Sequence, residues 1–199
     1  MSVVEAVMSS PRVYQLWQAP FADRKLAPML TSRTATGPRR VLDVGCGPGT
    51  NAKYFMGADY VGVDINDEYV RFARRRYGRT FVTADVVASP LPGLAPFDCI
   101  LVNSVLHHLD DAAVRAVLLK LRELLARDGA IHMLELVLPD RGGPARWLAR
   151  WDRGRHARSL GAWRELFAEA FTLDAFDPYP LGAFGVPLWQ MVYGRGRLP

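Results

Sequence analysis

Short apolar runs alternate with amphipathic stretches along the first two thirds of the chain, and this alternation is the strongest constraint on its fold. The runs are rich in branched residues and nearly continuous in hydrophobicity, which is typical of strands buried on both faces of a parallel sheet. They occupy residues 39–45, 59–65, 79–85, 97–105 and 129–138. The pattern predicts an α/β three-layer sandwich in which helices cover a mainly parallel sheet.

Two of the intervening segments predict helices. Residues 66–78 place apolar residues among charged ones and end at Gly78, a residue type that commonly terminates helices. Residues 110–129 begin with two aspartates, which favour a helix N-terminus, and end at Gly129. Each segment links two predicted strands, as the crossover helices of a parallel sheet do.

The two ends of the chain depart from this repeating pattern. Residues 159–171 predict a last helix, and two strand-like runs joined by a loop with Gly and Pro follow it. These runs predict a terminal antiparallel hairpin. Residues 11–31 predict a helix ahead of the sheet, which we expect Pro20 and Pro28 to interrupt.

The first strand leads into a glycine turn, in the sequence VLDVGCGPGTN. A strand, a glycine turn and a helix bring backbone N–H groups together at the carboxyl edge of the sheet, where open sheets bind ligands. Gly45, Gly47 and Gly49 do not match the G-x-G-x-x-G dinucleotide fingerprint, because the third glycine comes one residue early. Asp43 would repel a diphosphate, whereas it can accept hydrogen bonds from an ammonium group. Both features disfavour a nicotinamide oxidoreductase and favour a ligand with a cationic amino-acid end.

Two more aspartates stand at the ends of the next two predicted strands. Asp64 ends the second strand, where a carboxylate can accept both hydroxyls of a ribose. Asp85 ends the third strand, where a carboxylate can accept from the exocyclic amine of an adenine. Together with Asp43, these residues extend the predicted ligand into a nucleoside.

From residue 39 to 138, the runs VLDVGCGPG, YVGVDI, TADVVASPL and FDCILVNSVLHHL resemble the successive motifs of class I S-adenosylmethionine-dependent methyltransferases. The resemblance implies a Rossmann-like fold with strand order 3-2-1-4-5-7-6 and an antiparallel strand 7. It also implies S-adenosyl-L-methionine as the cofactor and S-adenosyl-L-homocysteine as its product.

The same resemblance implies the division of labour within the cofactor site. Residues of the glycine turn face the methionine part, those after the second strand face the ribose and adenine edge, and those after the third face the adenine. Residues after the fourth strand line the pocket near the reactive methyl. The expected cofactor-binding residues are Tyr14, Asp43, Gly45, Cys46, Gly47, Asn51, Asp64, Ile65, Asp85, Val86, Asn103 and Ser104.

The N-terminal segment supplies aromatic residues to this expected site. In the resembling family a leading helix often closes over the cofactor, with an aromatic residue near the methionine end. Tyr14 is therefore expected to contact the cofactor or the substrate. Trp17 and Phe21 have the i, i+4 spacing of an apolar stripe, which favours packing in the core.

Two adjacent histidines follow the fourth predicted strand at the ligand-facing edge. Histidine titrates near neutral pH, so His107 or His108 could act as a general base when the acceptor must lose a proton. The alternative is that one of them packs against or caps the following helix and shapes the pocket. His132, in the middle of the fifth run, is expected in the core. Glu135, near the end of that run, is a candidate to line the pocket.

The remaining ionisable and sulfur-containing residues suggest no metal centre. The four histidines and the two cysteines, Cys46 and Cys99, form no cluster with metal-ligand spacing. No apolar run approaches the ~18–20 residues that a membrane helix needs, and the N-terminus does not resemble a secretory signal. With so few cysteines, these features predict a cytoplasmic protein.

The net charge of +5 is concentrated in a basic segment at residues 141–158. Its charged residues are Arg141, Arg146, Arg150, Arg153, Arg155 and Arg158, with Asp152 as the single acid. Three interpretations remain open: a solvent-exposed basic helix, a site for an anionic group such as phosphate or carboxylate, or contact with a membrane surface for a lipid-linked substrate.

The sequence thus predicts a methyltransferase that acts on oxygen, nitrogen or carbon of a small molecule. A methyltransferase for RNA or another macromolecule is an alternative that the positive charge permits. The fourth run ends in NSVL, however, and lacks the Asn/Asp-Pro-Pro-aromatic pattern of enzymes that methylate base amino groups, so no specific nucleic acid is expected. A cofactor-binding protein without transferase activity is the other alternative.

The chain is expected to form one methyltransferase domain over residues 1–199. Four parts are predicted within it: a helical cap at 1–36, a cofactor-binding core at 37–138, a basic substrate-side insert at 139–160, and the last helix and hairpin at 161–199.

Overall fold

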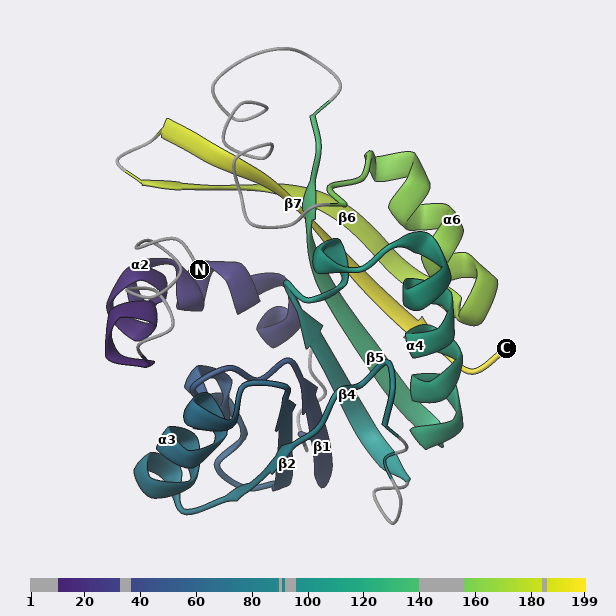
Figure 1. Ribbon diagram of the computed structural model, residues 1–199. Helices are drawn as coiled ribbons and strands as arrows, with labels where there is room; N and C mark the ends of the chain where they lie inside the picture. The colour runs from purple at the N-terminus through teal and green to yellow at the C-terminus, as the bar shows by residue number, and fades with distance from the viewer. Residues whose placement is uncertain (1–10, 33–36, 90, 92–95, 140–155, 184–185) are drawn as a thin grey trace.

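Seven strands form one sheet in the order β3-β2-β1-β4-β5-β7-β6, with helices on both faces (Figure 1). The computed structural model describes residues 11–32, 37–89, 91, 96–139, 156–183 and 186–199. The strands are β1 Arg40–Val44, β2 Asp59–Asp64, β3 Thr80–Thr83, β4 Phe97–Asn103, β5 Leu125–Val137, β6 Thr172–Ala183 and β7 Val186–Arg197. Their neighbours are parallel except at β7, which runs antiparallel to β5 and β6. The predicted sandwich and its strand order are confirmed.

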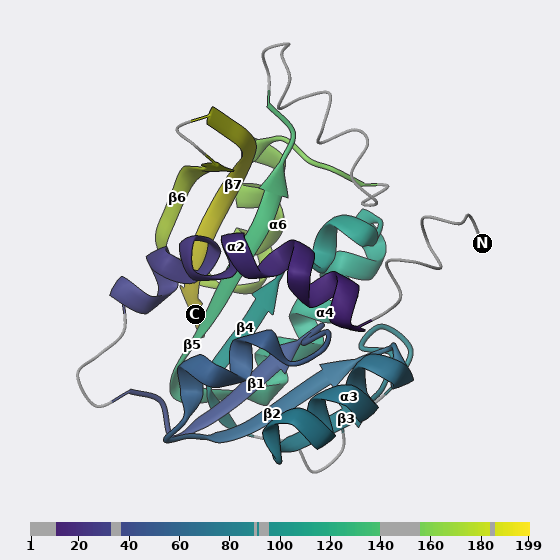
Figure 2. The ribbon, with the colours of Figure 1, turned by 90° about the vertical axis from the view of Figure 1, so that its left-hand side faces the viewer.

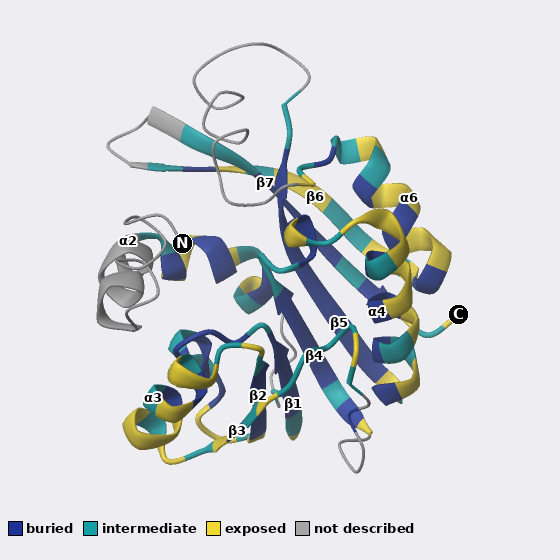
Figure 3. Cartoon of the chain, in the orientation of Figure 1, coloured by how far each residue is buried: buried dark blue, intermediate teal, exposed yellow. Residues whose placement is uncertain are grey.

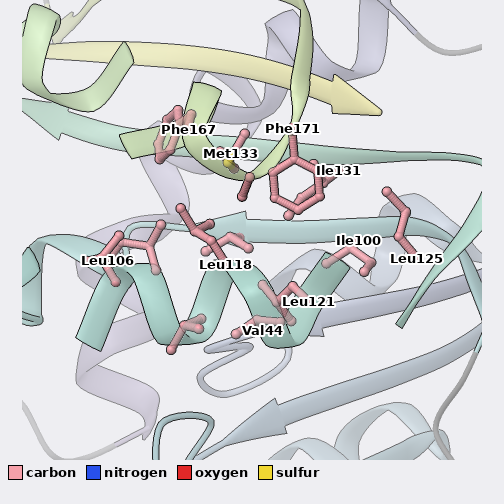
Figure 4. Close-up of a cluster of buried hydrophobic side chains, with 14 of the residues drawn as sticks. Val44, Ile100, Leu106, Leu118, Leu121, Leu125, Ile131, Met133, Phe167 and Phe171 are labelled. Atoms are coloured by element: carbon pink, nitrogen blue, oxygen red, sulfur yellow. The ribbon is translucent and has the colours of Figure 1, made fainter. Parts of the chain in front are cut away.

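One face of the sheet is covered by α4 (Asp111–Leu124) and α6 (Leu160–Ala170). Both helices place apolar residues at helical spacing against the strands, and their outward faces remain exposed (Figure 3). Figure 4 shows the resulting cluster, in which Leu118 and Leu121 of α4 lie near Ile100 of β4 and Ile131 of β5. Burial of each such side chain contributes about 1.5–3 kcal/mol, so this layer is a main source of stability.

The other face is covered by α2 (Pro11–Thr31), the 3₁₀ helix η1 (Thr50–Phe55) and α3 (Asp67–Tyr77). Figure 2 shows α2 lying across the sheet on this face. Leu26 and Met29 of α2 are fully buried in a cluster with Leu134 of β5 and Tyr193 of β7. The α2 helix is therefore tied to the sheet by its C-terminal half.

Local sequence explains most of the helix boundaries. Asn66, Asp110 and Ser159 cap α3, α4 and α6 through side-chain oxygens that accept backbone N–H groups of the first turn. Gly78 ends α3 in the left-handed region at φ 60°, and its N–H donates to Arg74 O.

Two boundaries differ from the sequence prediction. The α2 helix runs through Pro20 and Pro28 without interruption. Each proline removes a single N–H donor, and burial of the last turns against the sheet favours the continuous helix. The α4 helix ends at Leu124 rather than at Gly129, because Leu125 pairs with Phe97 and already belongs to β5.

The predicted terminal hairpin is formed by β6 and β7. Near its tip Leu181 and Met191 pack on Leu136 of β5, with Phe21 of α2 and Trp189 at the margin.

None of the helices in the described part of the chain has the length and apolarity needed to cross a bilayer.

Candidate functional site

The carboxyl ends of β1, β2, β3 and β4 meet at one edge of the sheet. These strands are parallel neighbours in register, with Asp43 of β1 beside Gly62 of β2, and Asp64 of β2 beside Thr83 of β3. Val44 of β1 lies beside Val102 of β4. The structure therefore gathers the predicted residues that follow these strands along a single edge, as the sequence analysis expected.

The glycine turn after β1 depends on backbone conformations that favour glycine. Gly45, Gly47 and Gly49 have φ values of 66°, 53° and 80°. A Cβ on Gly45 would lie 2.1 Å from Cγ2 of Val105, in the loop that follows β4. The turn thus packs directly against that loop, and this contact leaves no room for a side chain at Gly45.

The Asp64 carboxylate holds the same turn from the neighbouring strand. Its Oδ2 accepts the N–H of Gly47 at 2.8 Å, and its Oδ1 accepts the N–H of Asn66 at 2.8 Å. Burial raises the pKa of Asp64, although these two bonds oppose the shift. A carboxylate offers about four acceptor positions, so two remain to accept ligand hydroxyls.

Ile65, the residue after Asp64, leaves 69% of its surface exposed. An exposed branched side chain beside a half-buried carboxylate offers an apolar wall for the flat face of a base. Both side chains suit the predicted ribose and adenine contacts, which remain predictions.

Asp43 is completely buried and satisfied within the protein. Its carboxylate accepts from the Tyr60 hydroxyl and, at 3.1 Å, from Nδ2 of Asn51. Burial raises its pKa to about 7, and the nearby negative charge of Asp64 adds to the effect. The hydrogen bond between Asp43, which precedes the glycine turn, and Asn51, which follows it, thus joins the two ends of the turn. No sequence signal pointed to Tyr60, which lies in an apolar run with no sign of a polar role.

Asp85 closes the turn that follows β3. Its Oδ1 accepts the N–H groups of Val87 at 2.8 Å and Ala88 at 3.3 Å. The ammonium of Lys120 on α4 donates to the carbonyls of this turn, Val86 O among them at 2.7 Å. The partly exposed Asp85 and Val86 are therefore held in place at the predicted adenine end of the site.

The end of β4 combines backbone strain with an unsatisfied polar atom. Ser104 has φ 58°, which no other non-glycine residue in the described ranges shares in the left-handed region. Oδ1 of Asn103 is buried and has no hydrogen-bond partner. Strain and orphaned polar atoms concentrate at functional sites. Both residues stand where the sequence predicts the pocket around the reactive methyl, and the Asn103 oxygen offers an acceptor to a ligand donor.

The two candidate histidines occupy different environments in the 3₁₀ helix η2 (Leu106–His108). His107 is buried, and its Nδ1 lies 2.7 Å from Oε2 of Glu135. His108 is exposed, and its ring centroid lies 4.2 Å from that of His107.

Glu135 is fully buried beneath the loop, so it does not line an exposed pocket, contrary to the candidate role suggested by its sequence position. His132 is buried, as expected, and its Nδ1 lies 2.9 Å from the Tyr193 hydroxyl.

Arg158, the last arginine of the basic segment, is a buried structural residue. Its guanidinium donates to Asp111 Oδ1 at 2.8 Å and to the carbonyls of Leu106 at 3.3 Å, Leu109 at 2.7 Å and His156 at 3.0 Å. It therefore clamps the loop that carries His107. Its place in the basic segment predicts an arginine that faces solvent or a ligand, and for Arg158 that prediction is wrong because the side chain is buried.

Several predictions fall outside the described residues. The side chain of Tyr14 and residues 140–155 of the basic segment lie there, as do parts of the predicted cap and insert. Within the described ranges, no group of three or more His, Cys, Asp or Glu residues could hold a metal ion. Cys46 and Cys99 are buried, and neither forms a disulfide.

Comparisons with known proteins identify the family. The family described as "Methyltransferase domain" matches residues 41–129. An uncharacterized methyltransferase of Mycobacterium tuberculosis (strain H37Rv) is 31% identical over 141 residues, which cover 68% of this chain and 70% of that protein. A trans-aconitate 2-methyltransferase of Acidovorax sp. (strain JS42) is 29% identical over 197 residues, covering 92% of this chain and 71% of that protein.

A solved structure shows the same fold. The N-methyltransferase NodS of Bradyrhizobium japonicum WM9, crystallised with S-adenosyl-L-homocysteine, superposes with a TM-score of 0.77 at 18% identity. The match covers 98% of this chain and 96% of NodS.

Proposed function

This chain belongs to the methyltransferase-domain family of class I S-adenosylmethionine-dependent methyltransferases, and from that premise we propose that it methylates a small molecule. The observation that carries the proposal is the match over 92% of the chain to a protein named for a small-molecule acceptor, trans-aconitate. The NSVL end of β4, which lacks the Asn/Asp-Pro-Pro-aromatic pattern, also disfavours a nucleic-acid base as the acceptor.

The residues at the strand ends fit the cofactor. Asp64 keeps two acceptor positions for the ribose, Ile65 offers an apolar wall for the adenine, and the orphaned Oδ1 of Asn103 offers an acceptor near the methionine end. When bound, S-adenosyl-L-methionine supplies a methyl group on a sulfonium, which is already a strong electrophile. The chain's own task is to align a nucleophile and to exclude water.

Among the two histidines, we assign the role of base to His107. Its Nδ1 is paired with the buried carboxylate of Glu135. A histidine paired with a carboxylate in this way is found where a base must be oriented, as in Ser-His-Asp sites. His108, exposed beside it, is the second candidate. A base of this kind contributes about 10²–10⁴-fold to the rate.

We also propose that the protein acts in the cytoplasm. Neither Cys46 nor Cys99 forms a disulfide, which suits a reducing compartment.

A two-stage experiment tests the small-molecule proposal. Thermal melting with saturating S-adenosyl-L-homocysteine first establishes a cofactor-competent preparation, with NAD as the negative control. That preparation is then incubated with a donor carrying an isotope-labelled methyl and with separate acceptors: trans-aconitate, a fatty acid, a phenol, an amine and an RNA transcript. Mass spectrometry should find the label on a small molecule. Label on the RNA alone would contradict the proposal.

A further inference from the structure

The backbone after β3 forms a single helix-like turn that is closed by one backbone hydrogen bond. The N–H of Ser89 donates to Asp85 O at 2.7 Å, which is a bond from residue i+4 to residue i. At the start of the turn, Oδ1 of Asp85 accepts the N–H groups of Val87 and Ala88. An isolated turn of this kind is unfavourable, because several backbone dihedrals are fixed for one hydrogen bond. Its conformation therefore depends on support from the rest of the protein.

The ammonium of Lys120 gives that support at the other end of the turn. Lys120 belongs to α4 and lies 31 to 34 residues along the chain from its partners. Its Nζ lies 2.7 Å from Val86 O, 3.0 Å from Val87 O and 2.9 Å from Ser89 O. Carbonyls at the end of a helical turn have no partner within the turn itself. Because an ammonium has three N–H donors, Lys120 commits its full donor capacity to this one turn.

The side chains of the turn add an apolar anchor on the same side. Val86 and Val87 pack against the hydrophobic cluster that contains Leu118 and Leu121 of α4. The turn is thus held to α4 both by apolar contacts and by the ammonium. Of these two anchors, the ammonium is the one that fixes the backbone carbonyls.

This support leaves one oxygen of the Asp85 carboxylate available to a ligand. Oδ1 is committed to the two N–H groups of the turn, whereas Oδ2 makes no hydrogen bond to any residue that the structure describes. The direction of Oδ2 follows the conformation of the turn, because Oδ1 is fixed on its backbone. Asp85 is partly exposed, and it lies at the strand end where the sequence predicts contact with the exocyclic amine of an adenine.

We propose that Lys120 is a positioning residue that directs Oδ2 of Asp85 at the exocyclic amine and so sets the preference of the site for adenine. The proposal builds on the predicted contact between Asp85 and the adenine, and it holds for any methyl acceptor. An exocyclic amine donates to a carboxylate, which can only accept. A purine with a carbonyl oxygen in that place presents an acceptor, which the carboxylate disfavours.

Two ligands that differ at this position measure the preference. S-inosyl-L-homocysteine carries an oxygen where S-adenosyl-L-homocysteine carries the exocyclic amine. Isothermal titration calorimetry on the full chain gives the dissociation constant of each, and the ratio of the two is the base selectivity. The parent should bind the adenine compound about 10- to 100-fold more tightly, as expected for one hydrogen bond to a charged group.

Variants of Lys120 separate positioning from general stabilisation. Lys120→Met keeps an unbranched side chain and removes all the donors, so the base selectivity should fall about tenfold or more. Lys120→Arg should recover part of it, because a guanidinium can also donate to carbonyls. Arg115→Met is the matched control: it removes a cation from the same helix, where Arg115 makes an exposed ion pair with Glu169, and should leave the selectivity unchanged.

Asp85→Asn tests the path by which Lys120 acts. The asparagine oxygen can still accept from the turn, while its NH₂ group replaces Oδ2 and favours the carbonyl of the inosine compound. This variant should therefore lose the preference for adenine. Combining it with Lys120→Met should change the selectivity little further, because both substitutions act on the same contact.

The contrary outcomes are distinct. Equal affinities in the parent, or an unchanged selectivity in Asp85→Asn, overturn the adenine contact and the proposal with it. A selectivity that persists in Lys120→Met, even with both ligands weakened, assigns Lys120 a structural role only. If Lys120→Met does not fold, Lys120→Gln takes its place, and unchanged selectivity there also overturns the proposal. No acceptor enters these binding measurements, so their result is independent of the proposed small-molecule function.

Discussion

Oδ2 of Asp64 accepts the backbone N–H of Gly47 at 2.8 Å, which joins the end of β2 to the glycine turn after β1. The carboxylate predicted to bind the ribose therefore also shapes the turn predicted to bind the methionine end. Oδ1 accepts the N–H of Asn66, so both oxygens of the carboxylate are held in one orientation. Its remaining acceptor positions therefore point in fixed directions. The cofactor contacts at these two strand ends should consequently be coupled.

Asp64→Ala should remove most of the stabilisation by S-adenosyl-L-homocysteine. A ligand at about 100 times its dissociation constant adds about 2.7 kcal/mol, or roughly 5–10 °C in melting temperature for a chain of this size. The variant loses both the acceptor and the support of Gly47. Differential scanning fluorimetry with and without ligand measures the shift.

Asp59→Ala is the matched control for that variant. Asp59 lies at the opposite end of the same strand and makes an exposed ion pair with Arg40, so its removal should leave the ligand shift unchanged. If Asp64→Ala shifts as much as the parent, the ribose does not bind at Asp64.

Gly45→Ala should destabilise the protein more than Gly78→Ala. Both glycines have positive φ, so both alanines carry a backbone cost of about 1–2 kcal/mol. Only Gly45 also meets Val105, and overpacking adds about 1–3 kcal/mol. Urea denaturation measures the difference. A Val105→Ala background should recover part of the loss, and equal effects at the two glycines would show that the turn yields to the added methyl.

Arg158→Ala should lower the free energy of unfolding by about 2–4 kcal/mol, because it leaves several buried carbonyls without their charged donor. Asp111→Ala should cost about 1 kcal/mol or less, since its side chain is 61% exposed. Arg158→Lys should not recover the loss, because a point charge cannot replace the guanidinium fork. Chemical denaturation of the three variants checks this order; similar losses for Arg158→Ala and Asp111→Ala would place the energy in the ion pair instead.

Asp43 should make stability fall as the pH rises from about 4 to about 7. Its folded pKa, about 7, lies above the ordinary value of 3.8 for an aspartate, so the unfolded chain loses this proton first. Below pH 4 both states are protonated and the contribution is complete. Between the two values it is lost at about 1 kcal/mol per pH unit, and above pH 7 no further loss occurs.

Asp43→Asn isolates this effect, because an amide oxygen can still accept from Tyr60 and does not titrate. The difference in free energy of unfolding between parent and variant should change across pH 4–7 and be flat above it. If the free energies of unfolding of the parent and of Asp43→Asn change with pH in parallel, the pKa of Asp43 is not raised in the folded protein.

Periodicity alone was sufficient to predict the five parallel strands and the terminal hairpin, because each depends on residues close together in the chain. The glycine turn at Gly45, Gly47 and Gly49 was also predicted from local sequence, and the structure adds that all three glycines have positive φ. The end of α4 was not predicted correctly. Leu124 and Leu125 suit a helix, and it is pairing with Phe97, far away in sequence, that places Leu125 in a strand.

The sequence by itself determined which residues reach the carboxyl edge of the sheet, because parallel strands carry their ends to one side. The tertiary structure alone decided what those residues contact. Tyr60 donates to Asp43, Glu135 pairs with His107, and Arg158 donates to Leu106 O in the loop after β4. These partners lie 17, 28 and 52 residues apart in sequence, and they are brought together only by strand order and register. Burial and hydrogen bonding are properties of that neighbourhood, so no local pattern could have distinguished a structural arginine from a solvent-exposed one or a paired histidine from a free one.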